Sequence, residues 1–520
     1  MNPRARVSHV VSALLAMGAP LLSHAADHAS AASPASPASS KAPSASASPS
    51  SPVDTQPHSR NFVTSHTGMF GGTTISYLAT AADTMLTDPH GNPAAAVFSF
   101  TYTRQGVKDP SKRPVLFIFN GGPGSASLWI HMGALGPRRI ATEDPAHPTT
   151  IGPFHTIDNR LSPLDVADLV FIDPVGTGYS HVVGAGKPEE FYGVSEDAKA
   201  TADFIIAWLT RNHRWNSPKF VLGESYGTTR AAVLAKALGG GPFGGGTLPG
   251  VSLNGIVLLG LSMGSPGEDP EDQLLLPSLA ATAWYHGKVD KKGRTLEEFV
   301  SEVRKFAATE YGAALFAGSR LPGPERQAIA AKLAAFTGLS EPFILEHGLR
   351  ISSGDFAEQV LRERAQETGR YDARFTLPTA GSAHDPVADD PAMGQYTPGY
   401  VATFNDYLQT DLGITLEQRY EVISFAAVNS RWNWAPGSPS TLRGPELATA
   451  MRRNPSMRLL VGSGYYDLVT PFAAAQYTID HVEIPPDRVT FKNYESGHMV
   501  YLGEGPARAF VQDLREFLSQ

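Results

Sequence analysis

Short runs of apolar, β-branched and aromatic residues alternate with amphipathic stretches of helical length along the first half of this 520-residue chain. The runs cover residues 95–101, 114–119, 169–172, 219–222 and 255–259, and helices are expected at 195–210 and 226–238. Fully apolar strands need cover on both faces, which the helices of βαβ units supply. We therefore expect an α/β fold with a central, mostly parallel sheet.

The pattern changes between about residues 269 and 412. Segments 295–309 and 325–336 carry apolar residues at three-to-four spacing, which predicts a mainly helical insertion. Strand-like runs return at 457–462 and 489–494, and a closing helix is expected at 505–518. We therefore expect one α/β core in two parts, residues 61–265 and 415–520, separated by a helical cap at 266–414.

The N-terminus predicts export. Residues 1–25 have a basic start, an apolar stretch over 10–22 and a cleavage site of small residues, as a secretory signal peptide has, and we expect cleavage after Ala25 or Ala26. A membrane anchor would need roughly 20 apolar residues, more than this stretch offers. Residues 26–60 are rich in Ala, Ser and Pro, which predicts a flexible linker or a glycosylated stalk. The expected location is periplasmic or secreted.

Charge and cysteine content exclude several classes of function. With 42 Lys and Arg against 50 Asp and Glu, the formal net charge is −8, and no basic run suggests a nucleic acid partner. The absence of cysteine excludes disulfides, thiolate metal sites and a cysteine nucleophile. No His-Glu-x-x-His motif is present, so we expect no metal and no cofactor. No other apolar run has membrane length, so stable membrane insertion is not expected.

One motif indicates a catalytic serine. The apolar run at 219–222 leads directly into Gly223-Glu224-Ser225-Tyr226-Gly227, and a helix-forming stretch follows. In a nucleophile elbow, glycines let the chain turn sharply from strand to helix, so that the serine Oγ projects above the sheet. The next backbone N–H then faces the forming oxyanion. Ser225 is the candidate nucleophile of an α/β-hydrolase, and a structural turn with a bystander serine is the alternative.

A serine nucleophile needs a base, and the base needs an orienting carboxylate. Of the five histidines after Ser225, only His498 lies just beyond the last predicted strand and before the closing helix. Asp467 follows the strand run that ends at 462, where the fold places the acid. We therefore assign Asp467 as the acid and His498 as the base. The other candidates are His286, His347, His384 and His481 for the base and Asp480, Asp487 and Glu495 for the acid.

A second glycine-rich segment, residues 120–125, follows the predicted strand at 114–119. It lacks the Lys-Ser/Thr ending of a phosphate-binding P-loop. In a hydrolase the loop after an early strand supplies one oxyanion N–H, and adjacent glycines allow that backbone to approach the reacting carbonyl. We expect the N–H groups of Gly122 and Tyr226 to form the oxyanion hole.

Together these segments resemble the serine carboxypeptidases, peptidase family S10, of a bacterial exported type. The motifs are Asn120-Gly-Gly-Pro-Gly, the segment Asp173-Pro-Val-Gly-Thr-Gly-Tyr-Ser, Gly223-Glu-Ser-Tyr-Gly, the Asp467 loop and Gly497-His498. The resemblance implies an α/β-hydrolase core with a helical cap, and removal of C-terminal residues from peptide substrates through an acyl-enzyme. It also implies that Asn120, Gly121 and Glu224 bind the terminal carboxylate, which requires a protonated Glu224.

The chain departs from the family pattern at three positions. Ser125 stands where the family has a cysteine, Ile118 where it has a tryptophan, and Ala134 where it has a second glutamate. Two carboxyls that share a proton favour acidic pH, because like charges in one site raise one pKa. With Ala134 in place of the second carboxyl, we expect activity that extends to neutral pH.

The triad and the oxyanion donors define acyl transfer but not the leaving group. An esterase, an acyltransferase and an aminopeptidase on the same fold are therefore alternatives. A secreted binding protein that keeps the fold without catalysis is a further alternative.

Overall fold

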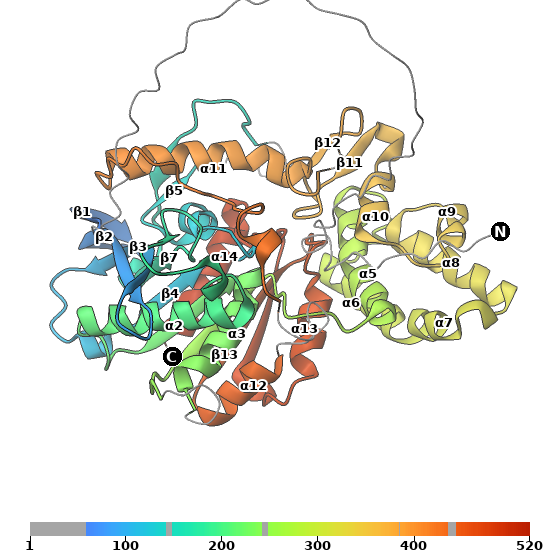
Figure 1. Cartoon of the computed structure of the whole chain (residues 1–520). Helices are drawn as coiled ribbons and strands as arrows, with labels where there is room; N and C mark the ends of the chain where they lie inside the picture. Colours follow the sequence, from blue (N-terminus) through green and yellow to red (C-terminus); the bar gives the residue numbers. More distant parts are fainter. Residues whose placement is uncertain (1–58, 142–147, 242–247, 384, 435–443, 520) are drawn as a thin grey trace, which may run out of the picture.

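The computed structural model describes residues 59–141, 148–241, 248–383, 385–434 and 444–519 (Figure 1). The predicted signal peptide, nearly all of the predicted linker and His384 lie outside the described residues.

The centre of the described chain is a ten-stranded sheet in the order β1-β2-β3-β7-β4-β9-β10-β13-β14, with β8 paired to β3. Its parallel part consists of β7 (Asp168–Ile172), β4 (Val115–Phe119), β9 (Lys219–Glu224), β10 (Gly255–Leu259), β13 (Arg458–Gly464) and β14 (Val489–Tyr494). Helices flank this sheet, which confirms the expected α/β-hydrolase fold with a mostly parallel sheet.

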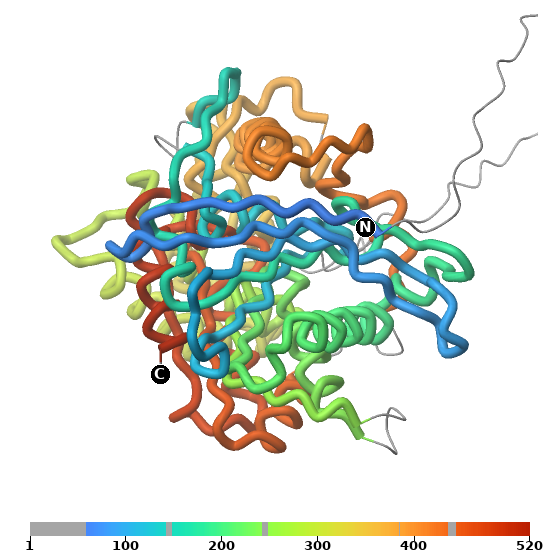
Figure 2. Tube along the Cα trace, turned by 90° about the vertical axis from the view of Figure 1, so that its left-hand side faces the viewer, coloured from blue at the N-terminus to red at the C-terminus, as the bar shows by residue number. Residues whose placement is uncertain are grey.

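The other edge of the sheet is antiparallel, a feature not predicted from the sequence. It contains β1 (Asn61–Phe70), β2 (Thr73–Thr87), β3 (Pro93–Arg104) and the short β8 (His181–Val182). Figure 2 shows β1 to β3 side by side along this edge. The run at 95–101 is the middle of β3 and not a parallel strand. β1 and β2 were not predicted because their exposed and covered residues alternate, so that neither forms a continuous apolar run.

Both faces of the parallel strands are covered, which explains their apolar sequences. In β4, Leu116 and Ile118 belong to one core cluster, while Val115, Phe117 and Phe119 belong to the other. The first face is covered by α11 (Pro391–Thr410) and α14 (Glu504–Ser519). The second is covered by α2 (Val194–Arg211), α3 (Tyr226–Gly239), α12 (Gly444–Arg453) and α13 (Phe472–Asp480). Figure 1 shows α11 on the opposite side of the strands from α2 and α3.

A third core cluster lies beside the sheet. It is formed mainly by α5 (Glu268–Tyr285), α6 (Leu296–Phe306), α7 (Gly312–Ala317), α8 (Gly323–Thr337), α9 (Glu341–Glu346) and α10 (Ser353–Gln359). This cluster reaches the sheet through residues that follow β13, among them Tyr466, Leu468 and Phe472. A small antiparallel pair, β11 (Gln366–Thr368) and β12 (Thr376–Pro378), separates these helices from α11. Although α11 falls inside the range proposed for the cap, it packs on the sheet.

Candidate active site

Ser225 lies in the turn between β9 and α3, with φ 60° and ψ −130°. A side chain with positive φ is strained, so the surrounding structure must hold it. Two glycines make this possible: a Cβ on Gly223 would lie 2.1 Å from the carbonyl oxygen of Gly227, and one on Gly227 would lie 3.0 Å from that of Asn120. The backbone N–H of Ser225 donates to Leu259 at 2.9 Å. The turn therefore has the geometry of a nucleophile elbow.

His498 and Asp467 meet at the ends of neighbouring strands. Asp467 follows β13, His498 follows β14, and His498 Nδ1 lies 2.8 Å from Asp467 Oδ2. The backbone N–H groups of Val469 and Thr470 donate to Asp467 Oδ1 at 2.8 and 2.9 Å. Thr470 Oγ1 donates to Asp467 Oδ2 at 2.5 Å and lies 3.1 Å from His498 Nδ1. The acid is thus held by three donors besides the histidine.

Burial and charge act on His498 in opposite directions. Burial alone would lower the pKa of this imidazole, but the negative charge of Asp467 and the hydrogen bond to it raise the pKa above its ordinary value. A base stabilised in its protonated form by a buried carboxylate is what proton transfer from a serine requires.

The other three candidate histidines that the structure describes contact backbone carbonyl oxygens away from Ser225. His286 Nε2 is 2.7 Å from the carbonyl oxygen of Ala373, His347 Nδ1 is 2.8 Å from that of Phe343, and His481 Nδ1 is 2.8 Å from that of Tyr477. The carboxyl that contacts His498 is Asp467, and no contact with Asp480, Asp487 or Glu495 is seen within the described chain.

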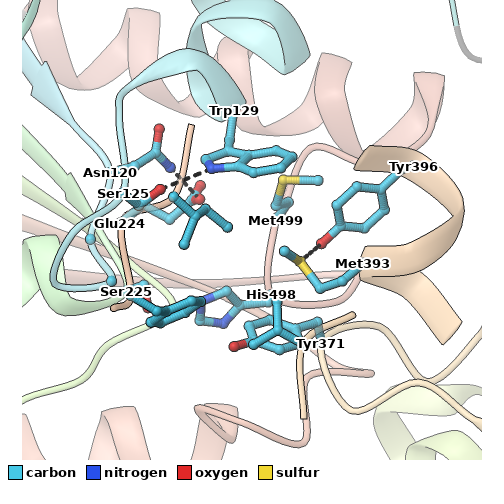
Figure 3. A pocket seen from close by; sticks show the side chains of 15 residues that line it. Asn120, Ser125, Trp129, Glu224, Ser225, Tyr371, Met393, Tyr396, His498 and Met499 are labelled. Carbon is cyan, nitrogen blue, oxygen red and sulfur yellow. Dashed lines mark hydrogen bonds between the residues drawn. The ribbon is translucent and has the colours of Figure 1, made fainter. Parts of the chain in front are cut away.

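A pocket opens beside the elbow (Figure 3). Ser225 and His498 lie together along one side, and Asn120 and Glu224 lie close by at one end. Gly121 and Gly122 also line it, together with Ser125, Trp129, Tyr371, Val387, Met393, Tyr396, Ile423, Phe425 and Met499. The predicted site residues therefore line one pocket, with two exceptions. Asp467 contacts His498 without lining the pocket, and Tyr226 follows Ser225 in the chain.

The polar end of the pocket is a buried amide–carboxyl pair. Asn120 Nδ2 donates to Glu224 Oε1 at 2.6 Å, and the carbonyl oxygen of Asn120 accepts from Arg230 at 2.6 Å. Burial raises the pKa of Glu224 to about 7, although the positive charge of His498 and hydrogen bonds from Tyr501 and Asn120 act to lower it. Below that pH the carboxyl carries a proton that it can donate to an anion.

The glycine loop lies directly against the start of α3. A Cβ on Gly121 would lie 2.5 Å from the backbone nitrogen of Tyr226 and 2.7 Å from the carbonyl oxygen of Glu224. Gly122 has φ +100°, a conformation that side chains rarely adopt. Glycine at these positions thus lets two backbone segments approach each other beside Ser225, as an oxyanion hole requires.

Hydrogen bonds hold this loop at the position where the family pattern has a cysteine. Trp129 Nε1 donates to Ser125 Oγ at 2.9 Å. A segment that follows α11 supplies the other contacts: the N–H of Ser424 donates to Gly124 at 2.7 Å, and Asn429 Nδ2 donates to Pro123 at 3.1 Å. Of the other two departures, Ile118 is buried in β4 and Ala134 is buried in a π-helical turn, His131–Leu135.

The histidine loop is held by a segment, residues 371–374, that was not predicted from the sequence. The N–H of His498 donates to Tyr371 at 2.6 Å, and the N–H of Gly497 donates to Asp372 Oδ2 at 3.1 Å. Arg374 pairs with Asp372 at 2.6 Å and donates to the carbonyl oxygens of Glu495 and Leu502 at 2.8 and 3.2 Å. Residues 371–374 lie more than 100 positions before His498, so no local sequence pattern connects them.

An elbow serine, a buried aspartate and a histidine, in this chain order, are the arrangement typical of serine hydrolases of the α/β-hydrolase fold. The sequence profile of the serine carboxypeptidase family, peptidase family S10, matches residues 91–503. The chain belongs to this family.

Plant relatives match a shorter stretch. The chain is 31% identical over 142 residues to serine carboxypeptidase-like 33 of Arabidopsis thaliana, an alignment that covers 25% of this chain and 26% of that protein. It is 28% identical over 136 residues to serine carboxypeptidase-like 26 of Oryza sativa subsp. japonica, with 25% and 26% covered. These alignments span about a quarter of each relative's length.

A solved structure supports the fold. Kex1(delta)p, a prohormone-processing carboxypeptidase from Saccharomyces cerevisiae, superposes with a TM-score of 0.53 at 15% identity, covering 84% of this chain and 91% of that chain. Within the residues that the structure describes, no group of three or more His, Cys, Asp or Glu could hold a metal ion. In the same residues, no helix is long and apolar enough to cross a membrane.

Proposed function

We propose that this protein is a serine-type carboxypeptidase that releases C-terminal residues from peptides through an acyl-enzyme intermediate. The observation that carries the proposal is the pocket in which the Asn120–Glu224 pair lies beside Ser225 and His498. A donor set for an anion next to a nucleophile fits a substrate whose scissile bond lies one residue from a carboxylate.

In this proposal the substrate's terminal carboxylate accepts hydrogen bonds from Asn120, the N–H of Gly121 and the protonated carboxyl of Glu224. Ser225 Oγ then attacks the last peptide carbonyl, and His498 Nε2 takes its proton. The N–H groups of Gly122 and Tyr226 stabilise the oxyanion, and His498 returns the proton to the leaving amino acid. Water then takes the place of the leaving amine: His498 accepts a proton from it, its oxygen attacks the acyl carbonyl, and His498 returns the proton to Ser225 Oγ as the ester bond breaks and the shortened peptide leaves.

The walls of the pocket indicate which residues are released. Trp129, Met393, Tyr396 and Met499 surround the space beside the Asn120–Glu224 pair (Figure 3). Among the residues that line it, Glu224 and His498 are the ones that can carry charge. Apolar walls favour burial of an apolar side chain, and a charged one would lose its hydration without gaining a partner. We therefore expect release of apolar C-terminal residues.

The proposal includes export from a bacterial cell, to the periplasm or the medium, on the basis of the signal-like residues 1–25. N-terminal sequencing of the secreted protein should begin after Ala25 or Ala26, and a chain that retains Met1 would contradict this.

A digest of a mixed peptide pool, read by mass spectrometry, tests the activity. We expect stepwise loss of single residues from the C-terminus, most rapid where the last residue is apolar. Ser225→Ala should show no digestion while it unfolds at the same temperature as the natural protein. Shortening from the N-terminus would indicate an aminopeptidase, and internal cleavage or no cleavage would also contradict the proposal.

A further inference from the structure

Two buried tyrosines, Tyr501 and Tyr400, lie beside Glu224. Tyr501 belongs to the loop that carries His498 and Tyr400 belongs to α11, and they are 2% and 1% exposed. Asn120 occupies Glu224 Oε1, whereas Glu224 Oε2 and the Tyr501 hydroxyl are both buried and neither has a hydrogen-bond partner among the described residues. An unpaired buried carboxyl oxygen is costly, and the Tyr501 hydroxyl, which also lacks a partner, is the donor available to it.

The two tyrosines differ in how they act on Glu224. Tyr501 affects the pKa of the carboxyl as a hydrogen-bond donor as well as by charge. Tyr400 interacts with it by charge alone. The chain therefore offers a matched pair of buried hydroxyls around one carboxyl, of which Tyr501 is the one that affects its pKa as a donor.

Small residues create the room for both rings. A Cβ on Gly133 would lie 2.4 Å from Tyr501 Cε2 and 2.7 Å from the Tyr400 hydroxyl. Ala134, next in the chain, is 1% exposed. A larger side chain in this turn would displace the phenols, so the turn and the tyrosines form one packed unit beside Glu224.

Charge keeps Tyr501 protonated while Glu224 titrates. Burial and the negative charge of Glu224 raise the pKa of Tyr501 well above its ordinary value, so it remains a donor. A donor stabilises the ionised carboxyl and lowers its pKa. The other groups that act on Glu224 are His498 and Asn120, which lower its pKa, and Asp467, which raises it. Tyr400 faces Glu224 from α11.

We propose that Tyr501 is a positioning residue for Glu224: its hydroxyl holds the second carboxyl oxygen and sets the pH range over which the pocket accepts a free substrate carboxylate. This inference rests on the proposed carboxypeptidase activity. Ionised Glu224 repels that carboxylate, so kcat/KM for peptide acids falls as the pH rises through the pKa of Glu224, about 7.

The test is Tyr501→Phe, which keeps the ring and removes the hydroxyl. Loss of the donor raises the pKa of Glu224, so the descending limb of kcat/KM for an N-blocked dipeptide should move up by about half to one pH unit, the size expected for one hydrogen bond. Hydrolysis of an N-blocked amino acid ester without a free carboxylate should be unchanged. Tyr400→Phe, the matched control, should leave both profiles in place.

Two outcomes would overturn the inference. One is a descending limb that Tyr501→Phe and Tyr400→Phe leave equally unmoved, and the other is a loss that is equal for the dipeptide and the ester. A natural protein that hydrolyses the ester but not the dipeptide would instead contradict the carboxypeptidase proposal, and with it this inference. Retained ester hydrolysis reports that each variant is folded.

Discussion

At the scale of single residues, the aspartate of the proposed triad is held by more groups than the histidine alone. Asp467 accepts from His498 and also from Thr470 Oγ1 and two backbone N–H groups. Every donor added to a carboxylate lowers its basicity. The hydrogen bond from Thr470 therefore weakens the interaction between Asp467 and protonated His498.

Thr470→Val tests this, because valine keeps the shape and removes the hydroxyl. Asp467 then stabilises protonated His498 more strongly, so the pKa of His498 rises further. Because neutral His498 is the active form, the ascending limb of the pH profile should move up by about half a unit. The profile is measured with an ester substrate, on which Glu224 does not act. The control is Thr449→Val, which removes a hydroxyl that donates to the carbonyl oxygen of Pro445 on α12. A limb that stays in place or moves down would contradict this role.

Sequence reasoning could find Ser225, Asp467 and His498, because each follows a predictable strand in a fixed chain order. It could not find Thr470 or Tyr501, which act through contacts with residues already assigned. Nothing in the sequence states that the Tyr501 ring lies against Gly133, more than 350 positions earlier.

At the scale of elements, the loop after β14 takes its shape from the segment between β11 and β12. Asp372 and Arg374 are buried, and between them they bond the backbone on both sides of His498. A Cβ on Gly497 would lie 2.4 Å from the carbonyl oxygen of Tyr371. His498, the proposed base, is therefore positioned partly by residues 371–374, which lie within the range 266–414 proposed for the cap.

Arg374→Met tests whether Asp372 and Arg374 position the His498 loop for catalysis as well as stabilising the fold. Removing one partner of a buried ion pair leaves Asp372 uncompensated, which costs about 3–5 kcal/mol of unfolding free energy. With the His498 loop loosened, kcat should fall about tenfold or more while KM changes little. Urea unfolding and steady-state kinetics measure the two effects. Arg364→Met, on an exposed turn, should change neither. Lower stability with unchanged kcat in the folded protein would contradict the positioning role.

Elements were predictable where one physical signal dominated. Buried parallel strands such as β4 and β10 are apolar throughout, and α2 and α8 show helical spacing. The antiparallel β1 and β2 were missed because a strand with one covered face carries many polar residues. The segment 295–309 is helical as its spacing predicts, but α6 ends at Phe306 and a π-helical turn, Ala307–Tyr311, follows. A one-residue insertion in a helical turn leaves the apolar spacing almost unchanged.

At the scale of the whole molecule, the pocket collects residues from distant parts of the described chain. Asn120 follows β4, Ser225 follows β9, Met393 and Tyr396 lie on α11, and His498 follows β14. The ends of parallel strands bring the catalytic groups to one edge of the sheet, while α11 and the 421–434 segment close over it. The architecture thus places the proposed triad and the Asn120–Glu224 pair around one pocket.

The most direct test of the account is the ratio of kcat/KM for an N-blocked dipeptide and for its C-terminal amide, measured at pH 6. Glu224 is mostly protonated there and can donate to the carboxylate of the acid, whereas the amide offers no negative charge. Hydrogen bonds to a charged group contribute about 1.5–3 kcal/mol each, so the acid should be preferred by about 100-fold or more. Equal values for acid and amide would contradict the carboxypeptidase proposal.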